Sequence, residues 1–146
     1  MLDDPYLALL DALARGLRGV EPALLVQAQC LQLDGRRVDF SLERDAHDGA
    51  DDRIVLRCDV LRLPAPASEE VCRRLLRANN LWVGTHGATL ALRGDDVVML
   101  GVSARIASID GAGFSRLLNG LHREAGRWAQ RLADPQPLAI PPDMRA

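Results

Sequence analysis

The strongest periodic pattern in the chain lies near its C-terminal end. Apolar residues recur there at the spacing of one helical stripe, at Phe114, Leu117, Leu118, Leu121, Ala125, Trp128 and Leu132. Residues three and four positions apart share one face of an α-helix. The opposite face carries Arg116, Arg123, Glu124, Arg127 and Arg131. The pattern predicts a helix of more than about four turns, capped by Asp110, that must bury one face against another layer.

The first half of the chain carries strand and hairpin signals. A strand is expected from Leu24, with a bulge near Cys30, and Asp34-Gly35 then predicts a tight hairpin turn. In the next strand Val38, Phe40 and Leu42 alternate with polar residues. A third strand is expected to place one set of side chains on one face, at Ile54, Leu56, Cys58 and Val60. Its opposite face would carry Val55, Arg57, Asp59 and Leu61.

Two more helices and two more strands complete the pattern. The first helix is expected from Asp4 to Leu17, with Pro5 in its first turn. Ser68 is expected to cap another helix, and strands follow at about 88–93 and 97–106. The order is helix, three strands, helix, two strands, helix. Hairpin connections predict a mostly antiparallel sheet in an α+β fold, which would occupy residues 1–133 as a single domain. Four prolines mark residues 134–146 as a Pro-rich C-terminal tail.

The composition excludes several functional classes. The 146 residues carry a net charge of -2, and no basic block is interleaved with aromatic residues, so nucleic-acid binding is not expected. Three widely spaced cysteines indicate neither a disulfide framework nor a zinc site. The N-terminus does not resemble a secretory signal, and no apolar run is long enough for membrane insertion. We expect a cytoplasmic protein.

Residues suited to chemistry are few. The acidic loop of Asp45, His47, Asp48, Asp51 and Asp52 does not match a calcium-binding loop, and a solvated hairpin loop is expected. No nucleophile motif accompanies His86, which sits in a turn between Gly84 and Gly87. The sequence therefore predicts a binding protein with no catalytic residue, no metal and no cofactor, not an enzyme.

Three stretches together resemble the Tir-chaperone family, the class I chaperones of bacterial type III secretion. They are LLRANNLWVGTHGATLAL at Leu75–Leu92, DDVVMLGVSARI after it, and GFSRLLNGLHREAGRWAQRLAD in the last helix. The resemblance implies a homodimer that binds the N-terminal region of a secreted effector in extended form. Such binding would prevent aggregation and keep the effector ready for export. The resemblance also implies the secretion ATPase as a further partner.

Two residue sets follow from these expectations. The dimer interface is expected at Leu75, Leu81, Trp82, Val83, Val98, Leu100 and Val102. Effector binding is expected at Leu7, Leu10, Val38, Phe40, Leu42, Val55 and Leu61. The alternative for the residues of the first helix and second strand is that they face the core. The alternative for Trp82 is that it closes the core of its own monomer.

Two other functions remain open on the sequence. A small α+β ligand-binding domain would need convergent polar groups, for which Arg57, Asp59 and His86 are the candidates. A regulatory dimerisation domain of the same fold would have no export role.

Overall fold

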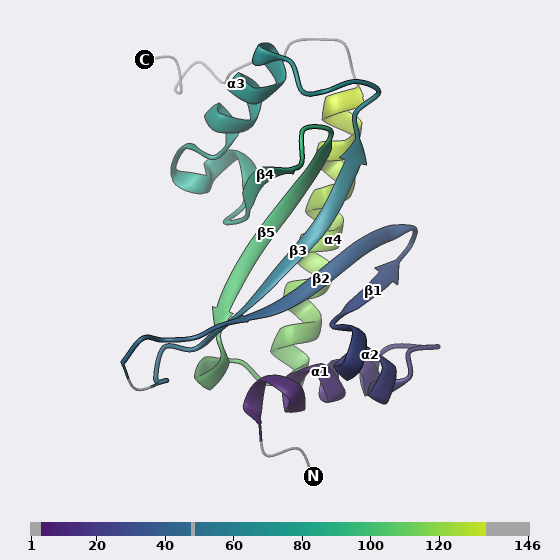
Figure 1. The fold of residues 1–146 in the computed structure, drawn as a ribbon, viewed down its shortest axis with the longest axis vertical. Helices are drawn as coiled ribbons and strands as arrows, with labels where there is room; N and C mark the ends of the chain where they lie inside the picture. The colour runs from purple at the N-terminus through teal and green to yellow at the C-terminus, as the bar shows by residue number, and fades with distance from the viewer. Residues whose placement is uncertain (1–3, 48, 134–146) are drawn as a thin grey trace.

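The computed structural model describes residues 4–47 and 49–133. The Pro-rich tail expected at residues 134–146 and the loop residue Asp48 lie outside this part of the chain. The elements follow in the order α1 (Pro5–Gly16), α2 (Pro22–Ala28), β1 (Cys30–Leu33), β2 (Arg36–Glu43), β3 (Arg53–Arg62), α3 (Glu69–Ala78), the 3-10 helix η1 (Asn80–Thr85), β4 (Thr89–Arg93), β5 (Val97–Arg105), the 3-10 helix η2 (Ile106–Ser108) and α4 (Gly111–Ala133) (Figure 1).

The five strands form one antiparallel sheet in the order β1-β2-β3-β5-β4. The predicted α+β class and the antiparallel sheet are both confirmed. Asp34 and Gly35 have φ values of 47° and 79°, as a two-residue hairpin turn of this twist requires. The pairing of β3 with β5 joins the N-terminal strands to the C-terminal hairpin, so that a single sheet runs through the molecule.

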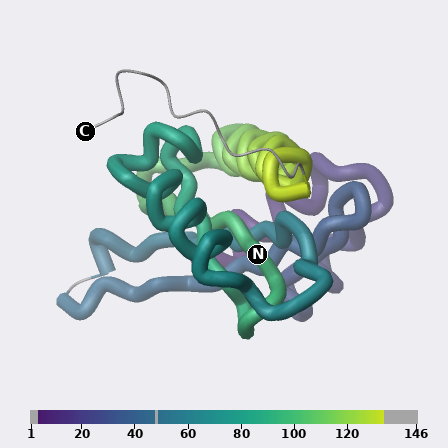
Figure 2. Tube along the Cα trace, turned by 90° about the horizontal axis from the view of Figure 1, so that it is seen from above, coloured from purple at the N-terminus to yellow at the C-terminus, as the bar shows by residue number. Residues whose placement is uncertain are grey.

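Helices cover one face of this sheet. In Figure 1, α4 runs behind the strands for most of their length, with α1 and α2 at its lower end and α3 at its upper end. Seen from above in Figure 2, α4 lies on one side of the strands and the segment α3–η1 flanks it. Phe40 of β2 meets Phe114 of α4 edge to face, with ring centroids 5.6 Å apart. Trp128 is also fully buried, which confirms the predicted apolar stripe of α4.

Side-chain caps begin three of the helices, and the caps at Ser68 and Asp110 are those that the sequence predicts. The Asp4 carboxylate accepts from the backbone N–H of Tyr6 at 2.8 Å, with Pro5 in the first turn of α1. Ser68 Oγ accepts from Val71 N at 3.2 Å at the start of α3. Asp110 Oδ1 accepts from Gly113 N at 2.7 Å at the start of α4. Each cap satisfies a backbone donor that has no partner inside its helix.

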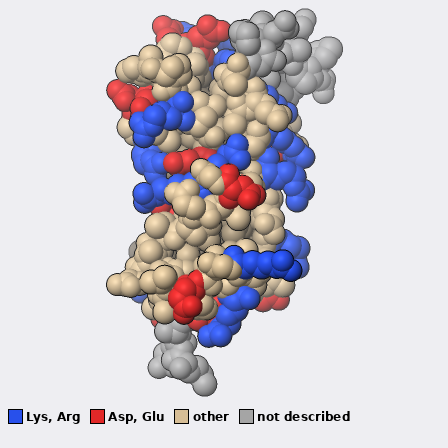
Figure 3. Space-filling model, turned by 90° about the vertical axis from the view of Figure 1, so that its right-hand side faces the viewer, with Lys and Arg blue, Asp and Glu red and all other residues tan. Residues whose placement is uncertain are grey.

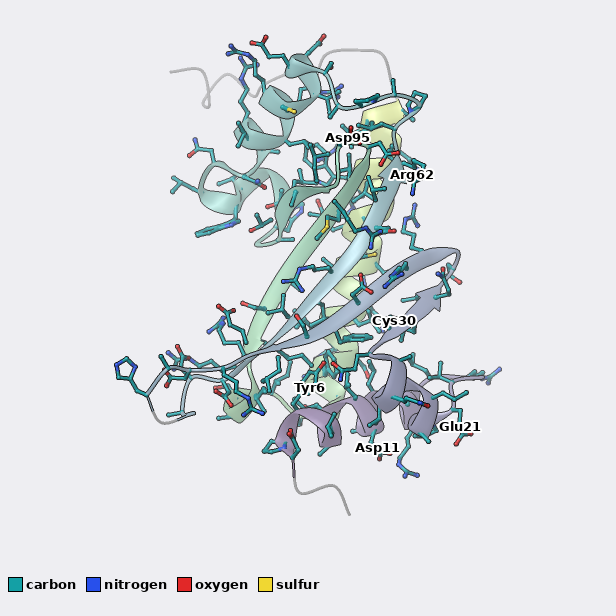
Figure 4. The ribbon with its side chains drawn as sticks, viewed as in Figure 1. Tyr6, Asp11, Glu21, Cys30, Arg62 and Asp95 are labelled. Carbon is teal, nitrogen blue, oxygen red and sulfur yellow. The ribbon has the colours of Figure 1, made fainter. Side chains whose placement is uncertain are left out.

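The strand expected from Leu24 is wrong, because Pro22–Ala28 forms the short helix α2. Leu25 buries its side chain in the core, and Gln29 ends the helix in the left-handed conformation with φ 51°. The Gln29 side chain accepts a hydrogen bond from the Tyr6 hydroxyl of α1 at 2.7 Å. Figure 4 shows Tyr6 and Cys30, the first residue of β1, close to this junction. The spacing of apolar residues in this segment does not distinguish a helix from a strand. Its packing against α1 therefore determines that it forms a helix.

A bulge in β3 changes the predicted placement of Leu61. The register shifts between Asp59 and Leu61, so that Asp59 pairs with Met99 and Leu61 pairs with Val98. Val98 is fully buried, and paired residues share one face of a sheet. Leu61 therefore lies on the helix-covered face beside Val60, not on the open face with Val55, as the strict alternation predicted.

Charge is mixed over the surface. On the side shown in Figure 3, basic and acidic side chains are interspersed in a band across the middle and are not separated by sign. Within residues 4–47 and 49–133, no helix is both long and apolar enough to cross a membrane.

Candidate interaction surfaces

Four large apolar side chains project from α3 and η1. Their exposed fractions are 70% for Leu76, 78% for Leu81, 53% for Trp82 and 60% for Val83. We call these four residues the apolar ridge. Isolated exposed apolar residues are common, but adjacent large ones mark a surface that a partner covers. The ridge includes the three consecutive residues that the sequence predicted for the dimer interface.

The backbone of the ridge is strained. Leu81 and Trp82 have φ values of 53° and 56°, in the left-handed region. This conformation costs about 1–2 kcal/mol for each residue that carries a Cβ. Gly84 allows the segment to fold back tightly, since a Cβ there would lie 3.0 Å from the carbonyl oxygen of Ala78. The surrounding contacts therefore hold the Leu81–Trp82 backbone away from its preferred conformation, with both side chains outward.

Two polar contacts tie η1 to the neighbouring strand. The Asn79 side-chain amide donates to Leu90 O and accepts from Leu90 N, both at 2.8 Å. Trp82 Nε1 donates to Thr89 Oγ1 at 3.0 Å. Asn79, just before η1, and Trp82 of the ridge are thus both hydrogen-bonded to β4, and these contacts hold the ridge against the sheet.

The turn after η1 is anchored to α4. His86 is left-handed with φ 51°, and its Nδ1 lies 3.0 Å from Oε2 of Glu124. Arg127 Nη1 donates to the same carboxylate oxygen at 2.9 Å. Glu124 is buried, although the helical pattern predicted it on the solvent face of α4. The sequence does contain a sign of this burial. Glu124 lies three residues after Leu121 and four before Trp128, which places it at the border of the apolar stripe.

The other residues predicted for the dimer interface lie elsewhere. Leu75, Val98 and Leu100 are buried in the core of the same chain, so they do not form an accessible surface. Val102 is half-buried on β5. The prediction failed for the buried residues because one layer of helices already covers that face of the sheet. The alternative that Trp82 closes its own core is wrong.

The residues predicted for effector binding divide in the same way. Leu10, Val38 and Phe40 are buried, which corrects their assignment to a groove and supports the core alternative. Leu7, Leu42 and Leu61 are half-buried and pack against the core from its margin. Val55 is half-buried on the open face of β3. The structure does not bring all seven together into one surface.

Polar side chains cover much of the open face of the sheet. Arg93 of β4 forms ion pairs with Asp59 of β3 and Asp39 of β2, the latter at 3.4 Å. Arg57 Nη1 donates to Ser41 Oγ at 2.8 Å. These contacts connect β4 to β3 and β2 across the intervening strand β5, and β3 to its neighbour β2. Arg57 and Asp59, two of the polar candidates for a ligand site, are therefore engaged in the sheet, and His86 lies beside α4.

The remaining chemical candidates have structural roles. Asp52 Oδ1 accepts from Asp45 N at 2.7 Å inside the acidic loop, and Asp51 pairs with Arg53 and Arg105. Among residues 4–47 and 49–133, no cluster of three His, Cys, Asp or Glu side chains could hold a metal ion. Cys58 is fully buried in β3, and this burial raises the pKa of its thiol to about 11.

Comparisons with known proteins found a solved structure of similar fold and a matching family. A chain of the ExsC–ExsE complex superposes with a TM-score of 0.56 at 20% identity, covering 76% of this chain and 77% of that chain. A chain of the ExoU–SpcU complex, from the type III secretion system of Pseudomonas aeruginosa, gives a TM-score of 0.39 at 18% identity, covering 64% and 78%. No curated protein sequence matches. The sequence model of the Tir chaperone protein (CesT) family matches residues 46–129. The chain belongs to this chaperone family.

Proposed function

We propose that the protein is a type III secretion chaperone that acts in the bacterial cytoplasm, binding the N-terminal region of a secreted effector in extended form. The family match over residues 46–129 carries this proposal. The shared fold of the ExsC–ExsE chain supports the architecture on which it depends. The protein binds and does not catalyse. It keeps apolar effector segments from aggregating before export.

The chaperone acts as a homodimer in this proposal, with the apolar ridge at the interface. Trp82 is the central anchor, since aromatic residues are enriched among the residues that dominate binding energy. Leu81 and Val83 flank it, and each exposes more than half of its side chain. A second copy that covers the ridge would remove this apolar surface from water, which supplies the driving force for association. The rigid attachment of η1 to β4 lowers the entropy cost of that contact.

The effector contacts the N-terminal half of the chain. Of the predicted residues, Leu7, Leu42 and Leu61 retain accessible surface at the margin of the core, and Val55 retains it on the open face of the sheet. The proposed contacts therefore lie on both faces, and the extended segment passes from one to the other. An extended segment binds by pairing its backbone with a sheet edge while alternate side chains enter neighbouring apolar sites. β1 is the edge strand on this side of the sheet. Docking of the loaded chaperone to the secretion ATPase stays a prediction of the family resemblance.

Co-expression with a candidate effector encoded nearby tests the function. The chaperone should retain an N-terminal effector fragment during purification. Val55→Asp should weaken retention, because it places an unpaired charge at the proposed contact. Ala91→Asp adds the same charge to the open face of β4 and should retain the fragment. Failure of the folded dimer to retain any N-terminal effector fragment would refute the proposal, and a regulatory dimerisation role would then be preferred.

A further inference from the structure

A cavity of about 270 Å³ lies between α4 and the turn that joins η1 to β4. Its apolar lining comes from Val102, Leu117 and Leu121. Its polar lining includes Arg116, Arg123 and Glu124. None of these residues belongs to the apolar ridge or to the effector contacts proposed above, although Val102 was among the residues predicted for dimerisation. The cavity is slightly smaller than the roughly 300–1,000 Å³ typical of drug-sized ligands, and suits one or two amino-acid side chains.

Glu124 lines this cavity, and one of its two carboxylate oxygens accepts no hydrogen bond from the described residues. Only 4% of the residue is exposed, and Oε2 takes both of its close contacts, from His86 and Arg127. Oε1 is buried and has no hydrogen-bond partner within residues 4–47 and 49–133. A buried acceptor without a donor is unfavourable, because its lost hydration is not replaced by a hydrogen bond. A ligand that presents an N–H group to Oε1 would recover this free energy.

Two arginines, Arg116 and Arg123, lie at the rim of the cavity. Arg116 and Arg123 extend from the exposed face of α4, and neither forms an ion pair with the part of the chain that the structure describes. A guanidinium group binds a carboxylate through two parallel hydrogen bonds. The rim therefore favours an acidic group and disfavours a basic one.

The adjacent edge of β5 is open to another strand. The last residue pair between β4 and β5 is Thr89 with Gly101, whereas β5 continues to Arg105. Over residues 102–105, β5 pairs with β3 alone among the described strands. An unpaired strand edge presents backbone donors and acceptors to an extended peptide. Val102 belongs both to this edge and to the cavity, so the two features form one site.

We propose that this site binds an extended peptide segment of a partner protein, with an apolar and an acidic side chain two positions apart. The backbone pairs with β5 beyond Gly101. Residues two positions apart face the same side of a strand, so both side chains point toward α4. The apolar side chain enters the cavity against Leu117 and Leu121, and the acidic one binds Arg116 and Arg123. A backbone N–H of the segment donates to Glu124 Oε1. This site stands independently of the effector surface on the N-terminal half.

The test is a nuclear magnetic resonance titration of the full-length, isotope-labelled protein. The probe is an acetylated and amidated pentapeptide of threonine with leucine at its second position and glutamate at its fourth. Millimolar peptide should shift the amide signals of residues 85–88, 102–105 and 116–124. A lysine in place of the glutamate should abolish binding, and an alanine in place of the leucine should weaken it. No shift at millimolar peptide, or equal shifts with the lysine peptide, would overturn the proposal.

Two variants separate the site from a general charge effect. Arg123→Ala should lower the affinity for the peptide by about five- to tenfold, the change expected for one charge-assisted contact. Arg73→Ala removes the same charge from the exposed face of α3 and should bind as the unmodified protein does. Equal loss in both variants would overturn the proposal. Signal changes at this site that follow protein concentration without peptide would also overturn it, because they would assign the site to a second copy of the chain.

Discussion

The side-chain amide of Asn79 forms both of its hydrogen bonds with the backbone of Leu90, one as donor and one as acceptor, each at 2.8 Å. The amide thus occupies the position that another strand would take beside β4. It joins the C-terminal end of α3 to the sheet and fixes where η1 begins. Within the described residues, no other side chain hydrogen-bonds the Leu90 backbone, and the Trp82 indole of the apolar ridge adds a hydrogen bond to Thr89 of the same strand.

Asn79→Ala should lower the free energy of unfolding by about 1–3 kcal/mol, since it leaves two backbone groups of Leu90 without their partners. Urea denaturation followed by circular dichroism measures this change. Asn80→Ala is the matched control, because Asn80 is exposed and should change stability by less than about 0.5 kcal/mol. Equal stability of the two variants would show that the amide clamp does not hold α3 and η1 on the sheet.

Trp82→Ala should weaken self-association by about tenfold or more, as expected for the central aromatic residue of an interface. Sedimentation equilibrium measures the dissociation constant. Leu24→Ala controls for the loss of exposed apolar area, since Leu24 is 62% exposed on α2, away from the ridge. Thr89→Ala controls for the loss of the indole hydrogen bond. An unchanged dimer in the Trp82 variant would remove the ridge from the interface.

Regular periodicity and local caps account for the parts of the fold that the sequence predicts well. The stripe from Phe114 to Leu132 and the cap at Asp110 depend on residues close in the chain. The helix α2 depends instead on distant contacts. Leu25 is buried in the core, and the Gln29 side chain accepts a hydrogen bond from Tyr6, more than twenty positions away in the sequence. When the spacing of apolar residues in a segment fits a helix and a strand equally well, such distant contacts determine which of the two forms.

The residues of the candidate surfaces were harder to predict for the same reason. Alternation in β2 shows that Val38 and Phe40 share a face, but it does not show that α4 covers that face. The bulge at Val60 reverses the side of Leu61, and a single inserted residue leaves no periodic signal. The exposure of Trp82 depends on two left-handed residues that are not glycine, and local preference disfavours that conformation.

Gly126→Ala should raise the free energy of unfolding by about 0.5–1 kcal/mol, because glycine inside a helix costs about that much relative to alanine. An added Cβ would meet only Arg36 Nη1, at 4.0 Å. Gly111→Ala is the informative contrast, since its Cβ would lie 3.0 Å from the Cβ of Ala12 on α1. Thermal denaturation should show a gain for the first variant and none for the second. A gain in both would mean that α1 and α4 are not in close contact at Gly111.

Tyr6 should make the protein less stable as the pH rises above about 10. Burial, and secondarily the negative charge of Asp4, raise the pKa of its hydroxyl from 10.0 to about 12. Below pH 10 the phenol is neutral in both states, so its contribution is complete. Between about pH 10 and 12 the unfolded chain ionises first, and stability falls by up to about 3 kcal/mol.

Tyr6 is the only tyrosine of the chain, so tyrosinate absorbance reports this one group. The midpoint of the titration should lie near pH 12 in the native protein and near 10 in concentrated urea. Tyr6→Phe removes the ionisable group together with the hydrogen bond to Gln29. The variant should be less stable at neutral pH by about 1 kcal/mol, and its stability should fall less steeply above pH 10. A native midpoint near pH 10 would mean that Tyr6 is accessible to water and that the α1–α2 junction is open.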